Sequence, residues 1–192
     1  MPWMDRVEAT RIAAELLTDE LVVCSTPMVS SYVRALAHRD RNFYLLNSMG
    51  MACSVGLGLA LARPDRRVVI FDGDGAVLMN AGALTTTAAH WPTNLVHVVW
   101  NNASYEATGG QASHAAGRTD LCTLARGAGL EQCAVADTLD DFRQGFRSCL
   151  RDPGPWFLVA NVQGRKEDVA GRVLRERPEA IKKRFLDAAD AQ

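Results

Sequence analysis

Short apolar runs alternate with longer segments of helical periodicity along most of the chain. The apolar runs predict buried strands at residues 21–24, 43–46, 68–71, 95–100, 133–136 and 156–162. Between them, apolar residues recur at helical spacing and predict helices over residues 1–17, 29–37, 50–62, 78–90, 121–129 and 139–150. This order predicts an α/β fold: a doubly wound, mostly parallel sheet with helices on both faces and a ligand site at the carboxyl ends of the strands.

Two segments interrupt the alternation. Residues 103–117 are polar and contain glycines, so we expect a long loop that is functional or mobile. Beyond Gly164 the chain is dominated by charged residues, and a terminal helix is predicted to open at Pro178. We therefore expect one domain over residues 1–164 and a charged C-terminal extension with a terminal helix over residues 165–192.

Composition narrows the classes of partner. With 192 residues, 48% of them hydrophobic, the chain can bury a core of its own. Its 21 basic and 22 acidic residues leave a net charge of −1. The chain therefore lacks the net positive charge that favours binding to nucleic acid or an anionic membrane. No run approaches the roughly 18 apolar residues of a membrane span. We expect a cytoplasmic protein with no nucleic-acid or membrane partner.

The cysteines do not form a recognisable pattern. Five are widely spaced and none belongs to a Cys-x-x-Cys pair: Cys24, Cys53, Cys122, Cys133 and Cys149. Such spacing favours reduced, mostly buried thiols over a disulfide framework or a structural zinc site.

The candidate chemistry follows two neighbouring strands. Gly73-Asp74-Gly75 comes after the strand at 68–71, and Asn101-Asn102 ends the strand at 95–100, with Asn101 27 positions beyond Asp74. The ends of adjacent parallel strands lie side by side, so Asp74 and Asn102 are expected to face one small volume. Carboxylate, amide and carbonyl oxygens suit Mg²⁺, which often completes its coordination with phosphate oxygens. The glycines let backbone approach an anion at the start of the next helix, so we predict a clamp for a metal and a diphosphate.

Each motif also has a plainer interpretation. Asp-Gly is a strong turn signal, so residues 72–75 are also compatible with a hairpin whose second strand is 77–79. An Asn-Asn pair after a strand often caps backbone groups. A dinucleotide-binding fingerprint is disfavoured because Leu78 stands where the third glycine belongs.

On these motifs the chain resembles the thiamin-diphosphate-dependent enzymes, whose cofactor-binding signature is Gly-Asp-Gly followed, after a helix and a strand, by Asn-Asn or Asp-Asn. Three segments look more narrowly like the sulfopyruvate and phosphonopyruvate decarboxylase group: Asn47-Ser48-Met49-Gly50, residues 71–79 and Thr108-Gly109-Gly110-Gln111. The resemblance spans residues 4–185. It departs from the group at Asn47, where glycine is usual, and at Ser25-Thr26-Pro27, which replaces a Thr-Gly or Asn-Gly segment.

The resemblance implies roles for particular residues. Mg²⁺ would be ligated by Asp74, the side chain of Asn102 and the backbone carbonyl of Ser104. Thiamin diphosphate would be contacted by that metal set and by Ser48, Met49, Gly73, Gly75, Ala76 and Val77. Within this set Ala76 and Val77 would donate backbone N–H groups to the diphosphate, and Met49 would wedge between the two rings. Gly109, Gly110 and Gln111 would form the active-site loop, and His114 and Arg118 are candidates for binding the sulfonate or phosphonate.

The resemblance covers only half of such an enzyme. A pyrimidine-binding domain, whose glutamate activates the cofactor, has no counterpart here, and Glu106 has no matching role. This implies a β-type subunit of a 2-oxoacid decarboxylase, with sulfopyruvate as the favoured substrate, in a hetero-oligomer with an α-type chain that carries the pyrimidine-binding domain and the glutamate. Alternatives are a phosphonopyruvate decarboxylase, a non-catalytic module that binds cofactor or partner, and a flavodoxin-like or nucleotide-binding sheet.

Overall fold

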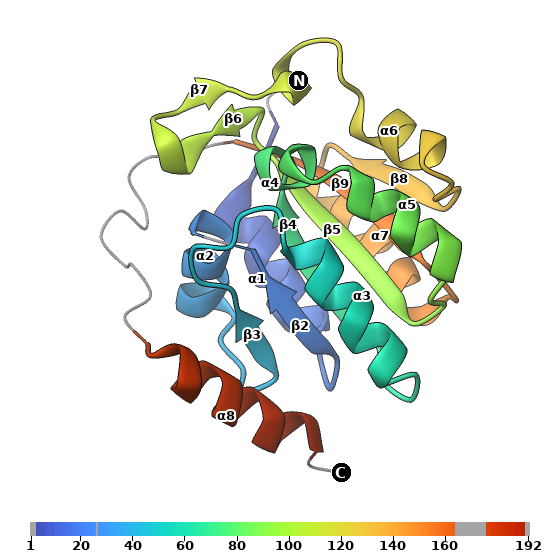
Figure 1. Ribbon diagram of the computed structural model, residues 1–192. Coiled ribbons are helices and arrows are strands. Elements are labelled where there is room, and N and C mark those ends of the chain that lie inside the picture. Colours follow the sequence, from blue (N-terminus) through green and yellow to red (C-terminus); the bar gives the residue numbers. More distant parts are fainter. Residues whose placement is uncertain (1–2, 26, 164–175, 191–192) are drawn as a thin grey trace.

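The computed structural model describes residues 3–25, 27–163 and 176–190, and it is built around a parallel sheet (Figure 1). The strand order is β1-β9-β5-β4-β2-β3, and β8 also pairs with β9. All of these pairs are parallel. The strands are β1 (Met4–Asp5), β2 (Leu21–Cys24), β3 (Asn42–Tyr44), β4 (Val68–Gly73), β5 (Leu95–Asn101), β8 (Cys133–Ala136) and β9 (Trp156–Gln163). The predicted fold class is confirmed.

Helices cover both faces of the sheet. One face carries α1 (Arg6–Leu16), α2 (Met28–Leu36) and α7 (Leu139–Arg151), and the other carries α3 (Ala52–Ala62), α5 (Gly82–His90) and α6 (Leu121–Gly127). Strand β4 shows why its sequence is apolar without interruption: Val69 and Phe71 pack in the cluster with α1 and α7, whereas Val68 and Ile70 pack in the cluster with α3.

The predicted helix at residues 78–90 is wrong in extent, because two helices occupy this region. Helix α4 (Asp74–Met79) starts as soon as β4 ends, and α5 begins at Gly82. Asn80 leaves the helical conformation, and its side-chain Nδ2 donates to the carbonyl of Gly50 at 3.0 Å. The hairpin alternative for residues 72–75 is also wrong, because a helix follows the turn.

The polar segment at residues 103–117 is a compact structure beside the carboxyl ends of the strands (Figure 1). It holds an antiparallel hairpin of β6 (Ser104–Tyr105) and β7 (Gln111–Ala112). Two short 3-10 helices, η1 (Glu106–Thr108) and η2 (His114–Ala116), complete it.

Both ends of the described chain are tied to the sheet. Helix α1 begins at Arg6, later than predicted, because the Asp5 side chain accepts from the backbone N–H of Val7 and caps the helix. At the other end, α8 (Pro178–Asp190) buries Phe185, whose ring meets that of Phe43 with centroids 5.4 Å apart. The expected boundary at 164 and most of the charged segment, residues 165–175, lie outside the described residues. Over the described ranges, no helix combines the length and the apolar character that a membrane span needs.

The expectation of reduced cysteines is wrong for two of the five. Cys122 and Cys133 form a disulfide, while Cys24, Cys53 and Cys149 are free and buried. Helix α6 packs on β8 and brings the two Cα atoms to 5.7 Å, a distance that a disulfide spans. A sequence separation of 11 residues contains no information about that proximity.

Candidate functional site

A pocket opens at the carboxyl ends of β2 and β4, where the chain leaves the sheet in opposite directions. After β2 it turns through α2 toward the edge strand β3, and after β4 it turns through α4 toward β5. Such a reversal point is the usual ligand position in open α/β sheets. The pocket wall includes seven residues that the sequence singled out: Met49, Gly73, Asp74, Gly75, Ala76, Asn102 and Ser104.

Asp74 is the first residue of α4, and its carboxylate is buried at 2% exposure. Burial raises the pKa of Asp74, while the Ser113 hydroxyl and the backbone N–H groups of Gly75 and Asn102 favour its charged form. The Ser113 hydroxyl donates to Oδ2 at 2.5 Å. A cation would stabilise this carboxylate further.

The amide of Asn102 is held at both ends. Its Nδ2 donates to Oε2 of Glu106 at 2.9 Å, and its Oδ1 accepts from the backbone N–H of Ser104 at 3.1 Å. A carbonyl oxygen has a second lone pair, so Oδ1 can still ligate a metal. Asp74, Asn102 and Ser104 thus supply oxygen donors to one pocket, and this set has the chemistry that Mg²⁺ prefers.

The pocket also fits an anion beside the metal set. Ser25 lies on its wall at 1% exposure, and its hydroxyl has no hydrogen-bond partner among the described residues. A buried hydroxyl without a partner is costly, and a phosphate oxygen would satisfy it. A Cβ at Gly73 would meet no atom within 4 Å, so open space adjoins this backbone. At Gly75 a Cβ would lie 2.6 Å from the Tyr105 ring, so that position requires glycine.

Met49 reaches the pocket from a segment with unusual backbone conformations. Asn47 and Gly50 have φ values of 52° and 85°. Asparagine tolerates the left-handed region better than most residues, which explains how Asn47 replaces the glycine usual in the group that the sequence resembles. Cε of Met49 lies 3.3 Å from the Cβ position of Gly75, so the side chain lies against the Gly-Asp-Gly turn.

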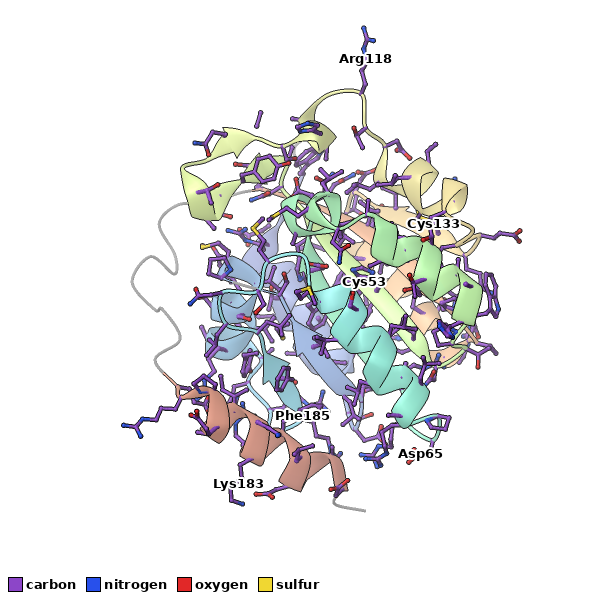
Figure 2. The ribbon with its side chains drawn as sticks, viewed as in Figure 1. Cys53, Asp65, Arg118, Cys133, Lys183 and Phe185 are labelled. Atoms are coloured by element: carbon purple, nitrogen blue, oxygen red, sulfur yellow. A yellow bond between two sulfur atoms is a disulfide. The ribbon has the colours of Figure 1, made fainter. Side chains whose placement is uncertain are left out.

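Several predicted site residues do not line this pocket. The Ser48 hydroxyl donates to the Leu46 carbonyl, and the Val77 side chain is part of the core under α5 and α6. Residues 109–111 are exposed at the end of the β6–β7 hairpin, where Gly109 and Gly110 have φ values of 124° and 77°. His114 is exposed, and the Arg118 side chain extends away from the molecule (Figure 2).

Two charged residues on the pocket wall were given no role by sequence reasoning: Arg6 was not singled out, and Glu106 was named but set aside. Arg6 comes from the first turn of α1 and Glu106 from η1, and they form an ion pair with Nη1 2.6 Å from Oε2. Burial lowers the pKa of Arg6, but the Glu106 carboxylate and Tyr32 outweigh it and raise the pKa above its ordinary value. The sequence offered one indication of a role for Glu106, its position four residues after Asn102.

A second pair of charged side chains, Asp72 and His97, is buried next to the Gly73-Asp74-Gly75 turn. Oδ1 of Asp72 accepts from the backbone N–H of Gly73 at 2.9 Å, and Oδ2 lies 3.3 Å from Nε2 of His97. Burial lowers the pKa of His97, but contacts with Asp72 and Cys53 raise it to about 9. The imidazolium and carboxylate therefore anchor the strand end that carries Gly-Asp-Gly.

Comparisons with known proteins agree with this geometry. The sequence profile of the thiamine pyrophosphate enzyme, C-terminal TPP binding domain, matches residues 22–160. A sulfopyruvate decarboxylase subunit beta of Methanothermobacter thermautotrophicus is 39% identical over 183 residues, which cover 95% of this chain and 94% of the relative. A phosphonopyruvate decarboxylase of Streptomyces viridochromogenes is 38% identical, with 91% of this chain and 43% of that protein covered.

Solved structures show the same fold. A thiamine diphosphate-dependent 4-hydroxybenzoylformate decarboxylase of Rhodococcus jostii superposes with a TM-score of 0.74 at 20% identity, over 87% of this chain and 34% of that one. A benzoylformate decarboxylase of Polynucleobacter necessarius gives 0.72 at 16% identity, over 82% and 33%. Since the profile match covers most of the chain, the protein belongs to the thiamine pyrophosphate enzymes and contains their C-terminal, TPP-binding domain.

Proposed function

We propose that this chain is the β-type subunit of a thiamin-diphosphate- and Mg²⁺-dependent decarboxylase that converts a small 2-oxoacid to an aldehyde and CO₂. The observation that carries the proposal is the convergence of Asp74, Asn102 and Ser104 in one pocket of a TPP-binding domain. Asp74, the Asn102 amide oxygen and the Ser104 carbonyl would hold the metal.

The surrounding residues would bind the rest of the cofactor. The Ser25 hydroxyl and the backbone around Gly73, Gly75 and Ala76 adjoin the space that a diphosphate would fill. Met49 would wedge between the two rings of the cofactor. Bound thiamin diphosphate supplies an electron sink for the electron pair released when CO₂ leaves a 2-oxoacid. Residues 109–111 would have to move from their exposed position to cover the reacting end and exclude water.

We propose that a partner chain supplies the pyrimidine-binding domain. The β subunit relative matches this chain nearly end to end, while the matched part of the phosphonopyruvate decarboxylase is 43% of a longer chain. That longer chain has room for a second domain, and an α-type partner would contribute that domain here together with the activating glutamate.

An uncharged surface supports this assignment. Residues 52–62 and 76–94 contain no Asp, Glu, Lys or Arg, and they form α3, α5 and their flanks, which lie side by side (Figure 1). Four large apolar side chains are exposed there: Met51, Leu61, Met79 and Trp91. Apolar side chains exposed on adjoining elements mark an interaction site when they form one patch, and we propose that these four do so. We call this surface, formed by residues 52–62 and 76–94, the α3–α5 face. Met79 lies next to Gly50, which follows the pocket residue Met49, so the α3–α5 face begins beside the pocket.

The partner assignment is tested by a charge on that face. Met79→Glu is expected to weaken co-purification of the partner at least tenfold, because a buried unpaired carboxylate opposes association. Val135→Glu is the matched control, since Val135 is an exposed apolar residue on β8. Equal partner recovery with both variants would contradict docking at the α3–α5 face.

Sulfopyruvate is the favoured substrate, with sulfoacetaldehyde and CO₂ as products. Sulfopyruvate decarboxylase β subunits are covered over 94% and 97% of their length, against 43% and 44% for the phosphonopyruvate decarboxylases. Phosphonopyruvate remains the second candidate because its decarboxylases are as similar in identity, at 38% and 36%.

Asp74→Asn tests the central claim. In the complex isolated with its native partner, we expect this variant to lose Mg²⁺-dependent retention of thiamin diphosphate and at least 99% of CO₂ release. The reason is that the substitution removes the negative charge of the carboxylate that would ligate Mg²⁺. Mass spectrometry measures the cofactor, and Asp65→Asn is the control because Asp65 is exposed and bonds only Arg63 among the contacts described.

The same assay separates the alternatives. Release of CO₂ from another 2-oxoacid, but from neither sulfopyruvate nor phosphonopyruvate, would overturn the substrate assignment. Cofactor retention without turnover of any 2-oxoacid would favour a non-catalytic module.

A further inference from the structure

The ion pair of Arg6 and Glu106 joins the first helix to the loop that carries the proposed metal ligands. Arg6 Nη1 donates to Oε2 at 2.6 Å and Nη2 donates to Oε1 at 3.0 Å, so the contact is bidentate. Arg6 is 7% exposed, and its guanidinium lies 3.9 Å from the centre of the Tyr32 ring. Its Nη2 also donates to the Tyr32 hydroxyl at 2.5 Å. A bidentate pair fixes the plane of the carboxylate as well as its position.

Glu106 transmits this orientation to Asn102. Its Oε2, already bound by Arg6, also accepts from Nδ2 of Asn102 at 2.9 Å. A carboxylate held by an arginine acts only as an acceptor, so the amide of Asn102 must present its NH₂ group to Glu106. The oxygen of the same amide is then turned the other way, where Ser104 N–H donates to it at 3.1 Å.

We infer that Arg6 and Glu106 are positioning residues for the metal site, which act through Asn102. They select the amide rotamer that offers oxygen to a cation, and they anchor residues 102–106 to α1 and α2. Oε2 of Glu106 is bound by both Arg6 and Asn102, so within this network the carboxylate acts on the metal through Asn102. The inference rests on the proposed function, because it takes Asn102 as a ligand of Mg²⁺.

Substitutions at positions 6 and 106 should each remove a particular contact of the network. Lysine at position 6 keeps the charge but cannot form the two-point contact. Glutamine at position 106 can still accept from Asn102 through its one oxygen, but it loses one acceptor toward Arg6. Alanine at position 106 removes the acceptor that holds Nδ2 of Asn102, so the amide keeps only its bond from the Ser104 N–H among the contacts described, and it also removes the carboxylate that binds Arg6.

The test uses the full-length chain with any partner that co-purifies, thiamin diphosphate, and Mn²⁺ as a spectroscopic substitute for Mg²⁺. The Mn²⁺ dissociation constant and electron paramagnetic resonance spectrum are measured for wild type, Glu106→Ala, Glu106→Gln, Arg6→Lys and Asp74→Asn. Glu8→Gln is the control, because Glu8 lies on the same helix, is exposed and bonds exposed Arg11. Melting temperatures identify any variant whose fold is damaged.

We expect Glu106→Ala to weaken Mn²⁺ binding by about 10- to 100-fold, the usual effect of removing a group that orients a metal ligand. Arg6→Lys and Glu106→Gln should fall between Glu106→Ala and wild type, with altered Mn²⁺ spectra. Arg6→Lys keeps the charge pair and should melt near the wild-type temperature, whereas Glu106→Gln should melt lower because Arg6 loses its counter-charge. Glu8→Gln should match wild type in affinity and spectrum. A purely structural ion pair would change the melting temperature and leave the Mn²⁺ spectrum unaltered.

The outcomes separate this inference from the proposed function. If Asp74→Asn abolishes Mn²⁺ binding while folded Glu106→Gln and Arg6→Lys keep the wild-type affinity and spectrum, the positioning role is overturned and the metal site stands. If wild type binds no Mn²⁺ with thiamin diphosphate, or Asp74→Asn binds it normally, the metal assignment fails and the positioning role fails with it.

Discussion

At the scale of single residues, two ion pairs lie beside the pocket, one partly and one fully buried, and they support it in different ways. Arg6 and Glu106 join the first helix to the loop after β5, whereas His97 and Asp72 join the neighbouring strands β5 and β4. In the second pair, Asp72 also accepts a hydrogen bond from the backbone N–H of Gly73. Breaking either pair by removing one partner leaves a buried charge uncompensated.

The His97 pair predicts how stability depends on pH. The pKa of His97 rises from 6.5 to about 9 on folding, so its contribution is complete below pH 6.5 and is lost as pH rises through 9. The loss should be on the order of 3 kcal/mol. Urea unfolding of wild type and His97→Gln between pH 6 and 10 measures it. A difference between the two unfolding free energies that stays constant over this range would contradict the charged pair.

At the scale of elements, α3 meets the sheet through glycine. Gly56 faces β4, and a Cβ there would lie 2.3 Å from Cγ1 of buried Ile70. Two residues later Gly58 is exposed, and a Cβ there would meet nothing within 4 Å. The close approach of α3 to β4 therefore depends on one glycine of the pair.

Alanine substitutions in α3 should separate the two glycines. Gly56→Ala forces Ile70 or the helix to shift and should destabilise the protein by roughly 1–3 kcal/mol. Gly58→Ala should stabilise it by about 0.5–1 kcal/mol, because alanine costs less backbone entropy in a helix. Chemical unfolding of both variants measures the difference, and equal effects would refute the packing argument.

At the scale of the whole molecule, the terminal helix α8 completes the edge of the sheet at β3. Phe185 points toward the sheet (Figure 2), is 6% exposed and meets Phe43, while the next residue, Leu186, is 46% exposed. Phe185→Ala should therefore detach α8 and cost up to about 3–5 kcal/mol, whereas Leu186→Ala should cost under about 0.5 kcal/mol. Hydrogen exchange over residues 178–190 distinguishes local detachment from global loss. Equal protection in both variants would contradict this packing.

The disulfide connects α6 and β8. Strand β8 pairs with β9, toward the edge of the sheet opposite to β3, where α8 packs. Alkylation of the unfolded chain without reductant should label three cysteines, Cys24, Cys53 and Cys149, and all five after reduction. Cys122→Ser should lower the free energy of unfolding by about 2–3 kcal/mol, because a cross-link of the unfolded chain is lost. Mass spectrometry counts the labels. Five labels without reductant would show that Cys122 and Cys133 are thiols in the isolated protein.

The sequence alone determined the fold class and which residues meet at the centre of the candidate site, because both are encoded locally. Uninterrupted apolar runs such as residues 68–71 indicate strands covered on both faces, and their alternation with helices implies a parallel sheet. In such a sheet neighbouring strand ends converge, so Asp74 and Asn102 were expected to meet, and both line one pocket. The boundary between α4 and α5 was missed because it depends on a tertiary contact from Asn80 to Gly50.

Tertiary structure alone decided which distant residues complete that site. Arg6 and Glu106 are 100 residues apart, and no periodicity or spacing connects them. The Ser25 hydroxyl, which has no hydrogen-bond partner in the described part of the chain, likewise depends on how elements pack, as do the exposed position of residues 109–111 and the Cys122–Cys133 bond. Local patterns record the surroundings of each segment, whereas contacts between segments depend on a packing that many residues determine together.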